Sequence, residues 1–111
     1  MAKVEQVQDD QMRALIDQAR SDYRSGNSTE SVHNSVEALL LLMQKQPEFI
    51  QMQRIPNTPL RKGRVWPAFG INVEIGEDLA PHAVYDREQF SKAEAITFYE
   101  FALDSLVAAE L

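Results

Sequence analysis

The 111-residue chain contains no cysteine. This absence excludes disulfides, thiolate zinc sites, iron–sulfur clusters and a cysteine nucleophile, and it is typical of the cytoplasm, where we expect the protein to act. The longest uninterrupted apolar run is six residues, 38–43, whereas a helix needs about 20 to cross a bilayer. Residues 1–10 contain no apolar block. We therefore expect neither a membrane span nor a secretory signal.

Glycine is scarce, at four residues, and no glycine-rich phosphate loop, nucleophile elbow or zinc pattern is present. The composition, 44% hydrophobic and 25% charged, is that of an ordinary globular protein and excludes collagen and a disordered chain. The length fits a single domain over residues 1–111. Because no nucleophile can be placed beside a base, we assign no catalytic residue and no cofactor. A non-enzymatic protein is the favoured prediction.

Positive charge is concentrated in one segment. The net charge of the chain is −6, yet residues 49–73 contain four basic residues and no acid, while residues 74–111 contain nine acids and two bases. A net negative chain repels nucleic-acid phosphates at long range, so general binding to nucleic acid is not favoured. A single anion could still bind at the basic segment.

Apolar spacing of three and four residues predicts two helices in the first half of the chain. The first runs from Val4 to about Ser25 and ends at Gly26, a residue type that favours the left-handed conformation of a helix C-terminus. The second runs from about Ser28 to Gln46, with Asn27 or Ser28 as its N-cap. Pro47 then begins a short helical element that extends to about Arg54.

The pattern changes in the middle of the chain. Apolar and polar residues alternate over 69–75, which predicts a half-buried strand that pairs with 64–66, with 83–85 or with a second subunit. Ser91 and Glu94 form a capping-box sequence at the start of a long last helix. The fold class predicted is therefore mainly α, a bundle of three to four helices with a short β-hairpin or strand in the middle.

The basic segment 61–66 is a candidate anion or nucleotide site. Arg61, Lys62 and Arg64 surround a glycine, and Trp66 follows as a surface on which a base could stack. In the alternative interpretation, these three basic side chains form ion pairs with acidic residues of the last helix or of another subunit, and Trp66 belongs to the core. This internal or inter-subunit pairing is the favoured interpretation.

Glu30, His33 and Glu37 lie on one face of the second predicted helix. A Glu-x-x-His step is the spacing used in di-metal helical bundles, and a homodimer would be needed to supply the second pair. In the alternative and favoured interpretation, Glu30 caps the helix and His33 and Glu37 form an exposed pair. His82 follows Pro81 in a polar region and is interpreted as a solvated loop histidine rather than a metal ligand.

Two helices carry more apolar surface than one facing helix can bury. Leu41 and Leu42 widen the apolar stripe of the second helix, and Phe98 and Phe101 widen that of the last. At roughly 25 cal/mol per Å² of exposed apolar surface, leaving two phenylalanine faces in water would cost a few kcal/mol. These four residues are therefore predicted to lie at the centre of the bundle or in a homodimer interface.

Two segments resemble the HEPN family of small helical domains, which includes ribonuclease toxins and nucleotide-binding accessory proteins. One segment is residues 19–42, with His33-Asn34-Ser35-Val36-Glu37-Ala38; the other is Phe90-Ser91-Lys92-Ala93-Glu94-Ala95, followed by Tyr99 and Ala102. The arginine that precedes the histidine by four to six intervening residues in the ribonucleases is missing before His33 and His82. The resemblance implies a helical, dimeric relative without the nuclease site.

The sequence thus favours a non-enzymatic interaction or adaptor protein that acts as a homodimer and binds a protein partner. The first alternative is a HEPN-like domain that binds a nucleotide or RNA through the basic segment 61–66. The second is a metal-binding helical bundle that uses Glu30, His33 and Glu37.

Overall fold

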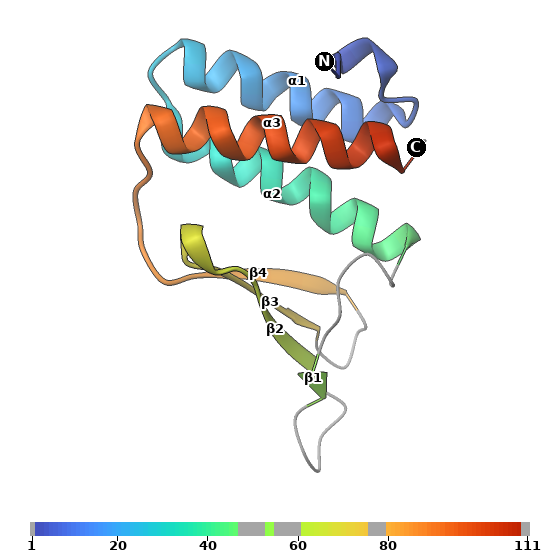
Figure 1. The fold of residues 1–111 in the computed structure, drawn as a ribbon, viewed down its shortest axis with the longest axis vertical. Coiled ribbons are helices and arrows are strands. Elements are labelled where there is room, and N and C mark those ends of the chain that lie inside the picture. The colour runs from blue at the N-terminus through green and yellow to red at the C-terminus, as the bar shows by residue number, and fades with distance from the viewer. Residues whose placement is uncertain (1, 47–52, 55–60, 76–79, 110–111) are drawn as a thin grey trace. The chain divides into compact units, whose positions relative to one another are not determined.

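The structure, a computed structural model, describes residues 2–46, 53–54, 61–75 and 80–109. The chain divides into two compact units. Met1–Leu42 and Gln89–Leu111 form the first, and Met43–Glu88 form the second. The first unit is helical, and the second contains an antiparallel sheet (Figure 1). The predicted fold class, mainly α with a short β element in the middle, is confirmed, and the β element is larger than one hairpin.

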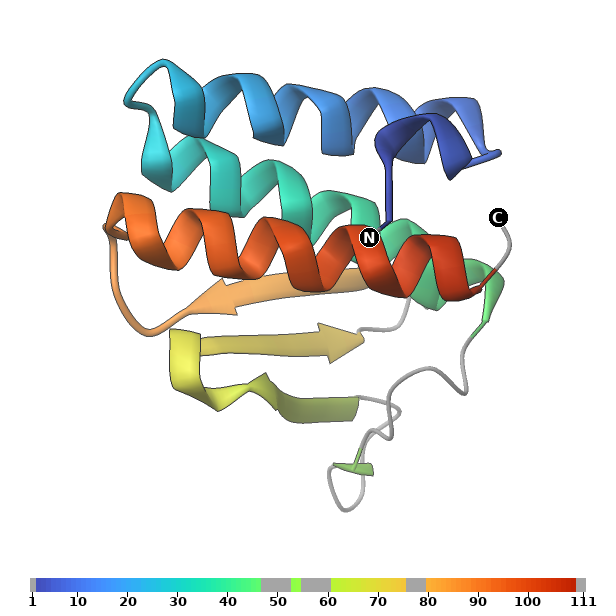
Figure 2. The ribbon, with the colours of Figure 1, turned by 45° about the horizontal axis from the view of Figure 1, so that its top comes forward.

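Three long helices lie alongside one another in the helical unit (Figures 1 and 2). They are α1 (Asp10–Arg24), α2 (Ser28–Lys45) and α3 (Lys92–Ala108), and a single 3-10 turn, η1 (Val4–Gln6), precedes them. The chain direction reverses between α1 and α2, and α3 runs antiparallel to α1 (Figure 2).

The first helix does not begin at Val4 as predicted. Asp9 has an extended backbone, with φ −70° and ψ 123°, and its side chain accepts a hydrogen bond from the Met12 N–H at 2.8 Å. An aspartate at this position satisfies one of the open N–H groups of a new helix, so the chain stops after η1 and starts again at Asp10. Val4 and Val7 nevertheless remain buried, as the apolar spacing indicates.

The turn between α1 and α2 follows the prediction. α1 ends at Arg24, and Gly26 adopts φ +86°, a left-handed conformation that costs glycine little. The Ser31 N–H donates to the Asn27 carbonyl at 3.0 Å, which makes Asn27 the residue that precedes the first turn of α2. α2 ends at Lys45, one residue before the predicted end.

The start of α3 is confirmed in detail. The Glu94 N–H donates to Ser91 Oγ at 3.2 Å, and the Ser91 N–H donates to Glu94 Oε1 at 3.0 Å. This reciprocal pair is the capping box that the sequence predicts. The N–H of buried Phe90 donates to Thr29 Oγ1 at 3.1 Å and so connects the entry of α3 to the first turn of α2.

One apolar face of each helix is buried. On α2 the buried residues include Val32, Val36, Leu39, Leu40 and Met43. On α3 they are Ala95, Phe98, Tyr99, Ala102, Leu103 and Leu106. Phe101 lies outside this buried face of α3, with 42% of its surface exposed.

The second unit contains four antiparallel strands in the order β1-β2-β3-β4. They are β1 (Gln53–Arg54), β2 (Arg61–Trp66), β3 (Ile71–Ile75) and β4 (Pro81–Tyr85). The predicted strand over 69–75 is β3, and it pairs with both suggested neighbours within the chain: Trp66 lies opposite Ile71, and Ala83 lies opposite Val73. Ile71 and Val73 are buried and Glu74 is exposed, as the alternation predicts.

The basic segment 61–66 forms strand β2, which pairs with β3. Three local expectations for this unit are wrong. Phe69 belongs to the 3-10 turn η3 (Pro67–Phe69) instead of the strand. His82 lies in strand β4 and not in a loop, although its side chain is exposed. A short helical element was expected from Pro47 to about Arg54, but residues 53–54 form strand β1. The rest of that segment lies outside the described residues.

Candidate functional site

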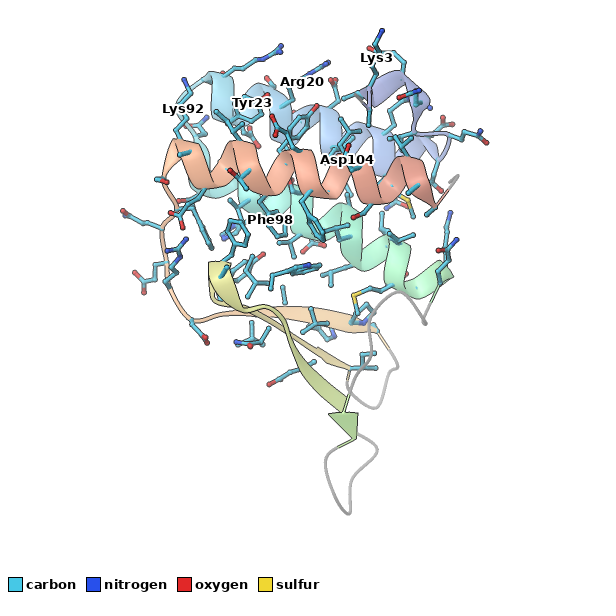
Figure 3. The ribbon with its side chains drawn as sticks, in the orientation of Figure 1. Lys3, Arg20, Tyr23, Lys92, Phe98 and Asp104 are labelled. Carbon is cyan, nitrogen blue, oxygen red and sulfur yellow. The ribbon has the colours of Figure 1, made fainter. Side chains whose placement is uncertain are left out.

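An open groove of about 570 Å³ lies within the helical unit, between η1, α1 and α3. Its volume is within the usual range of ligand pockets, about 300–1,000 Å³. Figure 3 shows the positions of Lys3, Arg20, Tyr23 and Asp104, four of the side chains that line it. Lys3 precedes η1, Arg20 and Tyr23 lie on α1, and Asp104 lies on α3.

Two tyrosines form part of the floor of the groove. The rings of Tyr23 and Tyr99 pack edge to face, with centroids 5.3 Å apart and planes at 62°. Tyr99 is 6% exposed, and burial raises the pKa of its phenol above the ordinary value, although the charges of Arg20 and Arg24 act in the opposite direction. The buried side chains of Val4 and Leu103 complete an apolar base.

Helical spacing presents these residues on one face of each helix. Arg20, Tyr23 and Arg24 are three and four residues apart on α1, so they share a face. Tyr99 and Leu103 are four residues apart on α3. The short segment before α1 is fixed to that helix, because Arg13 Nη1 donates to the Val7 carbonyl at 2.8 Å.

The α1 wall of the groove is basic. Arg20 forms an ion pair with Asp17 one turn earlier. Burial lowers the pKa of Arg20, but the hydrogen bond and the charge of Asp17 outweigh it, so the pKa lies above its ordinary value. Arg24 is exposed and acts on Tyr99 only through its charge. This wall therefore carries one cation held by a neighbour and one exposed to a ligand.

The α3 wall is acidic. Glu100 and Asp104 are four residues apart, line the groove and are both exposed. Neither forms an ion pair with the bases of the groove in the described part of the chain. The third wall, η1 with the residue before it, contributes one charge of each sign, Lys3 and Glu5. Opposite charges thus line two sides of an apolar floor without neutralising each other.

The predicted anion site lies in the other unit. Arg61, Lys62 and Arg64 belong to strand β2, and their side chains are outside the described part of the structure. Trp66 is described and is 8% exposed, so its ring offers little surface for a stacked base. The anion or nucleotide site at 61–66 stays a prediction.

The three predicted metal ligands, Glu30, His33 and Glu37, are all exposed on α2. Nowhere among the residues that the structure describes do three His, Asp or Glu side chains come together in a way that could hold a metal ion. The predicted site would take further ligands from a second copy, and it stays a prediction.

The four residues predicted for the bundle centre or an interface separate into different environments. Leu42 and Phe98 are fully buried, Leu41 is partly buried and Phe101 is exposed. The ring centroids of Phe98 and Phe101 lie 5.9 Å apart. Phe101 is thus the member of this set that presents its ring to the surface.

The groove was not identified from the sequence. None of its tyrosines or arginines was among the predicted site residues. The i, i+4 spacing of Arg20 and Arg24, and of Glu100 and Asp104, was a visible signal that each helix presents charge of one sign. The sequence did not indicate that these faces lie on the same groove.

Over the described ranges, the structure contains no helix of sufficient length and apolar character to span a membrane. Comparison of the chain with models of known protein families, with curated proteins and with solved structures finds no match in any of the three. The resemblance to the HEPN family accordingly remains a prediction from the sequence.

Proposed function

We propose that the protein is a non-enzymatic interaction protein of the cytoplasm that acts as a homodimer, with α3 around Phe101 as the contact surface. The observation that carries this proposal is the exposure of Phe101, 42%, on a helix whose neighbouring Phe98 is fully buried. Burying a phenylalanine side chain contributes about 1.5–3 kcal/mol. In a two-fold dimer the same patch meets itself, so one such side chain contributes twice.

The surroundings of Phe101 support a contact that forms and dissociates. Thr97 and Ala108 extend the exposed face with small uncharged side chains, whereas Glu100 and Asp104 add negative charge beside it. Two copies that meet at this face bring like charges together, which opposes association at low ionic strength. The dimer should therefore become tighter as salt is added.

Sedimentation at low micromolar concentration tests the proposal. The native protein is expected to sediment as a dimer, and Phe101→Ser is expected to sediment as a monomer with unchanged helix content. Val84→Ser is the matched control, because Val84 is exposed to almost the same extent, 41%, but lies on β4 of the other unit. A native protein that remains a monomer over this range, or a dimer that Phe101→Ser leaves intact, would refute the proposed interface.

A further inference from the structure

We propose that the groove between η1, α1 and α3 binds an extended peptide segment of a partner protein in which acidic and basic side chains alternate. The inference rests on the proposed role as an interaction protein and specifies the chemistry of the partner. It follows from the distribution of charge around the groove and from the geometry of an extended chain.

The first step is the polarity of the groove. Arg20 and Arg24 place positive charge on the α1 side, and Glu100 and Asp104 place negative charge on the α3 side. A ligand of one sign would be attracted by one wall and repelled by the other. A ligand with opposite charges on its two flanks is attracted by both.

The second step is the geometry of the ligand. Successive side chains of an extended chain point to opposite sides, with a rise of about 3.3 Å per residue. In a peptide with alternating acids and bases, all the acids therefore lie on one flank and all the bases on the other. Placed along the groove, such a peptide directs its acids to α1 and its bases to α3.

The third step is that the charged groups are available. Lys3, Arg24, Glu100 and Asp104 form no ion pair with any described residue, so a ligand does not have to displace internal partners. The apolar floor, Val4, Leu103 and the edge of the Tyr23–Tyr99 pair, suits the backbone and the aliphatic stems of the peptide. Lys3 and Glu5, both from the N-terminal segment, carry opposite charges and add one more contact for each flank.

The experiment uses two synthetic peptides of the same composition and no net charge. One alternates glutamate and lysine over about eight residues, roughly 26 Å when extended, and the other contains the same residues as a glutamate block followed by a lysine block. Binding to the full chain is measured by fluorescence anisotropy. The alternating peptide is expected to bind about tenfold more tightly than the block peptide, with the difference shrinking as salt is added.

Charge reversal identifies the site. Arg24→Glu makes both walls acidic at that level, and Glu100→Arg makes both basic, so each is expected to weaken binding of the alternating peptide about tenfold. Glu37→Lys, an exposed acid on α2 outside the groove, is the matched control and should have no effect.

Equal binding of the two peptides, or charge reversals that leave the affinity for the alternating peptide unchanged while circular dichroism shows an intact fold, would overturn the inference. The variant Phe101→Ser distinguishes failure of the peptide site from failure of the dimer proposal, because Phe101 does not line the groove. That variant should lose the dimer and keep its preference for the alternating peptide.

Discussion

Two serines one turn apart on α2 show how strongly a single hydrogen bond distinguishes similar positions. Ser31 and Ser35 are both fully buried. Ser31 Oγ donates to the Ala19 carbonyl at 2.7 Å and joins α2 to α1. Ser35 Oγ has no hydrogen-bond partner among the described residues. A buried hydroxyl without a partner costs free energy, whereas a satisfied one contributes about 1 kcal/mol.

The two serines therefore predict opposite effects of the same substitution. Ser31→Ala is expected to lower the free energy of unfolding by about 1 kcal/mol. Ser35→Ala is expected to raise it by about 1 kcal/mol, because it removes an unsatisfied hydroxyl and improves helix propensity. Urea denaturation of the two variants measures both values. Equal destabilisation by the two substitutions would contradict the hydrogen-bonding argument.

At the scale of elements, two glycines with positive φ close two different connections. Gly26 follows α1 with φ +86°, and no atom lies within 4 Å of the position that a Cβ would occupy. Gly70 joins η3 to β3 with φ +66°, and a Cβ there would lie 3.3 Å from the Cβ of Asp86. Asp86 is held in place, because its N–H donates to the Gly70 carbonyl at 2.7 Å and its side chain accepts from Asn72 at 2.9 Å.

Alanine substitution should therefore be more costly at Gly70 than at Gly26. Gly26→Ala bears only the cost of a left-handed backbone, about 1–2 kcal/mol. Gly70→Ala bears the same cost and also crowds Asp86, so it is expected to be more destabilising and to speed amide exchange in β3 and β4. Denaturant unfolding and hydrogen exchange measure these effects. If the Gly70→Ala protein were as stable as Gly26→Ala, Asp86 would have to move away from the added Cβ without a measurable loss of stability, which would contradict this prediction.

At the scale of the whole molecule, the burial of Tyr99 links stability to alkaline pH. Burial raises the pKa of Tyr99 in the folded protein above its unfolded value of about 10. Above that pH the unfolded chain releases its proton first, so the folded state holds more protons and the free energy of unfolding falls as pH rises. Below pH 10 both states are protonated, and the stabilisation is fully present.

Tyr99→Phe removes this linkage. The variant is expected to lose stability less steeply than the native protein as pH rises above 10, measured by denaturant unfolding across that range. Titration of the tyrosinate absorbance provides a second readout, in which a group that titrates above the ordinary value of about 10 disappears in Tyr99→Phe. An unchanged slope in that variant would refute the assignment.

Signals that act within a few residues were predictable. Ser91 with Glu94, the glycine at 26 and the alternation at 71–75 each specify local geometry through neighbouring hydrogen bonds or side-chain periodicity, and the structure confirms them. The failure at Asp9 is also local. An aspartate can occupy the exposed face of a continuing helix or cap a new one, and the apolar spacing around it is compatible with both.

The sequence by itself determined that the chain is mainly helical, where its last two helices begin and which faces of them are apolar, because these features depend on spacing and capping within each element. Only the tertiary structure decided that β3 pairs on both sides, that Phe101 lies at the surface while Phe98 is buried, and that η1, α1 and α3 enclose a groove with walls of opposite charge. Such features depend on contacts between residues far apart in the chain, and no local pattern encodes which of two apolar faces the rest of the molecule will cover.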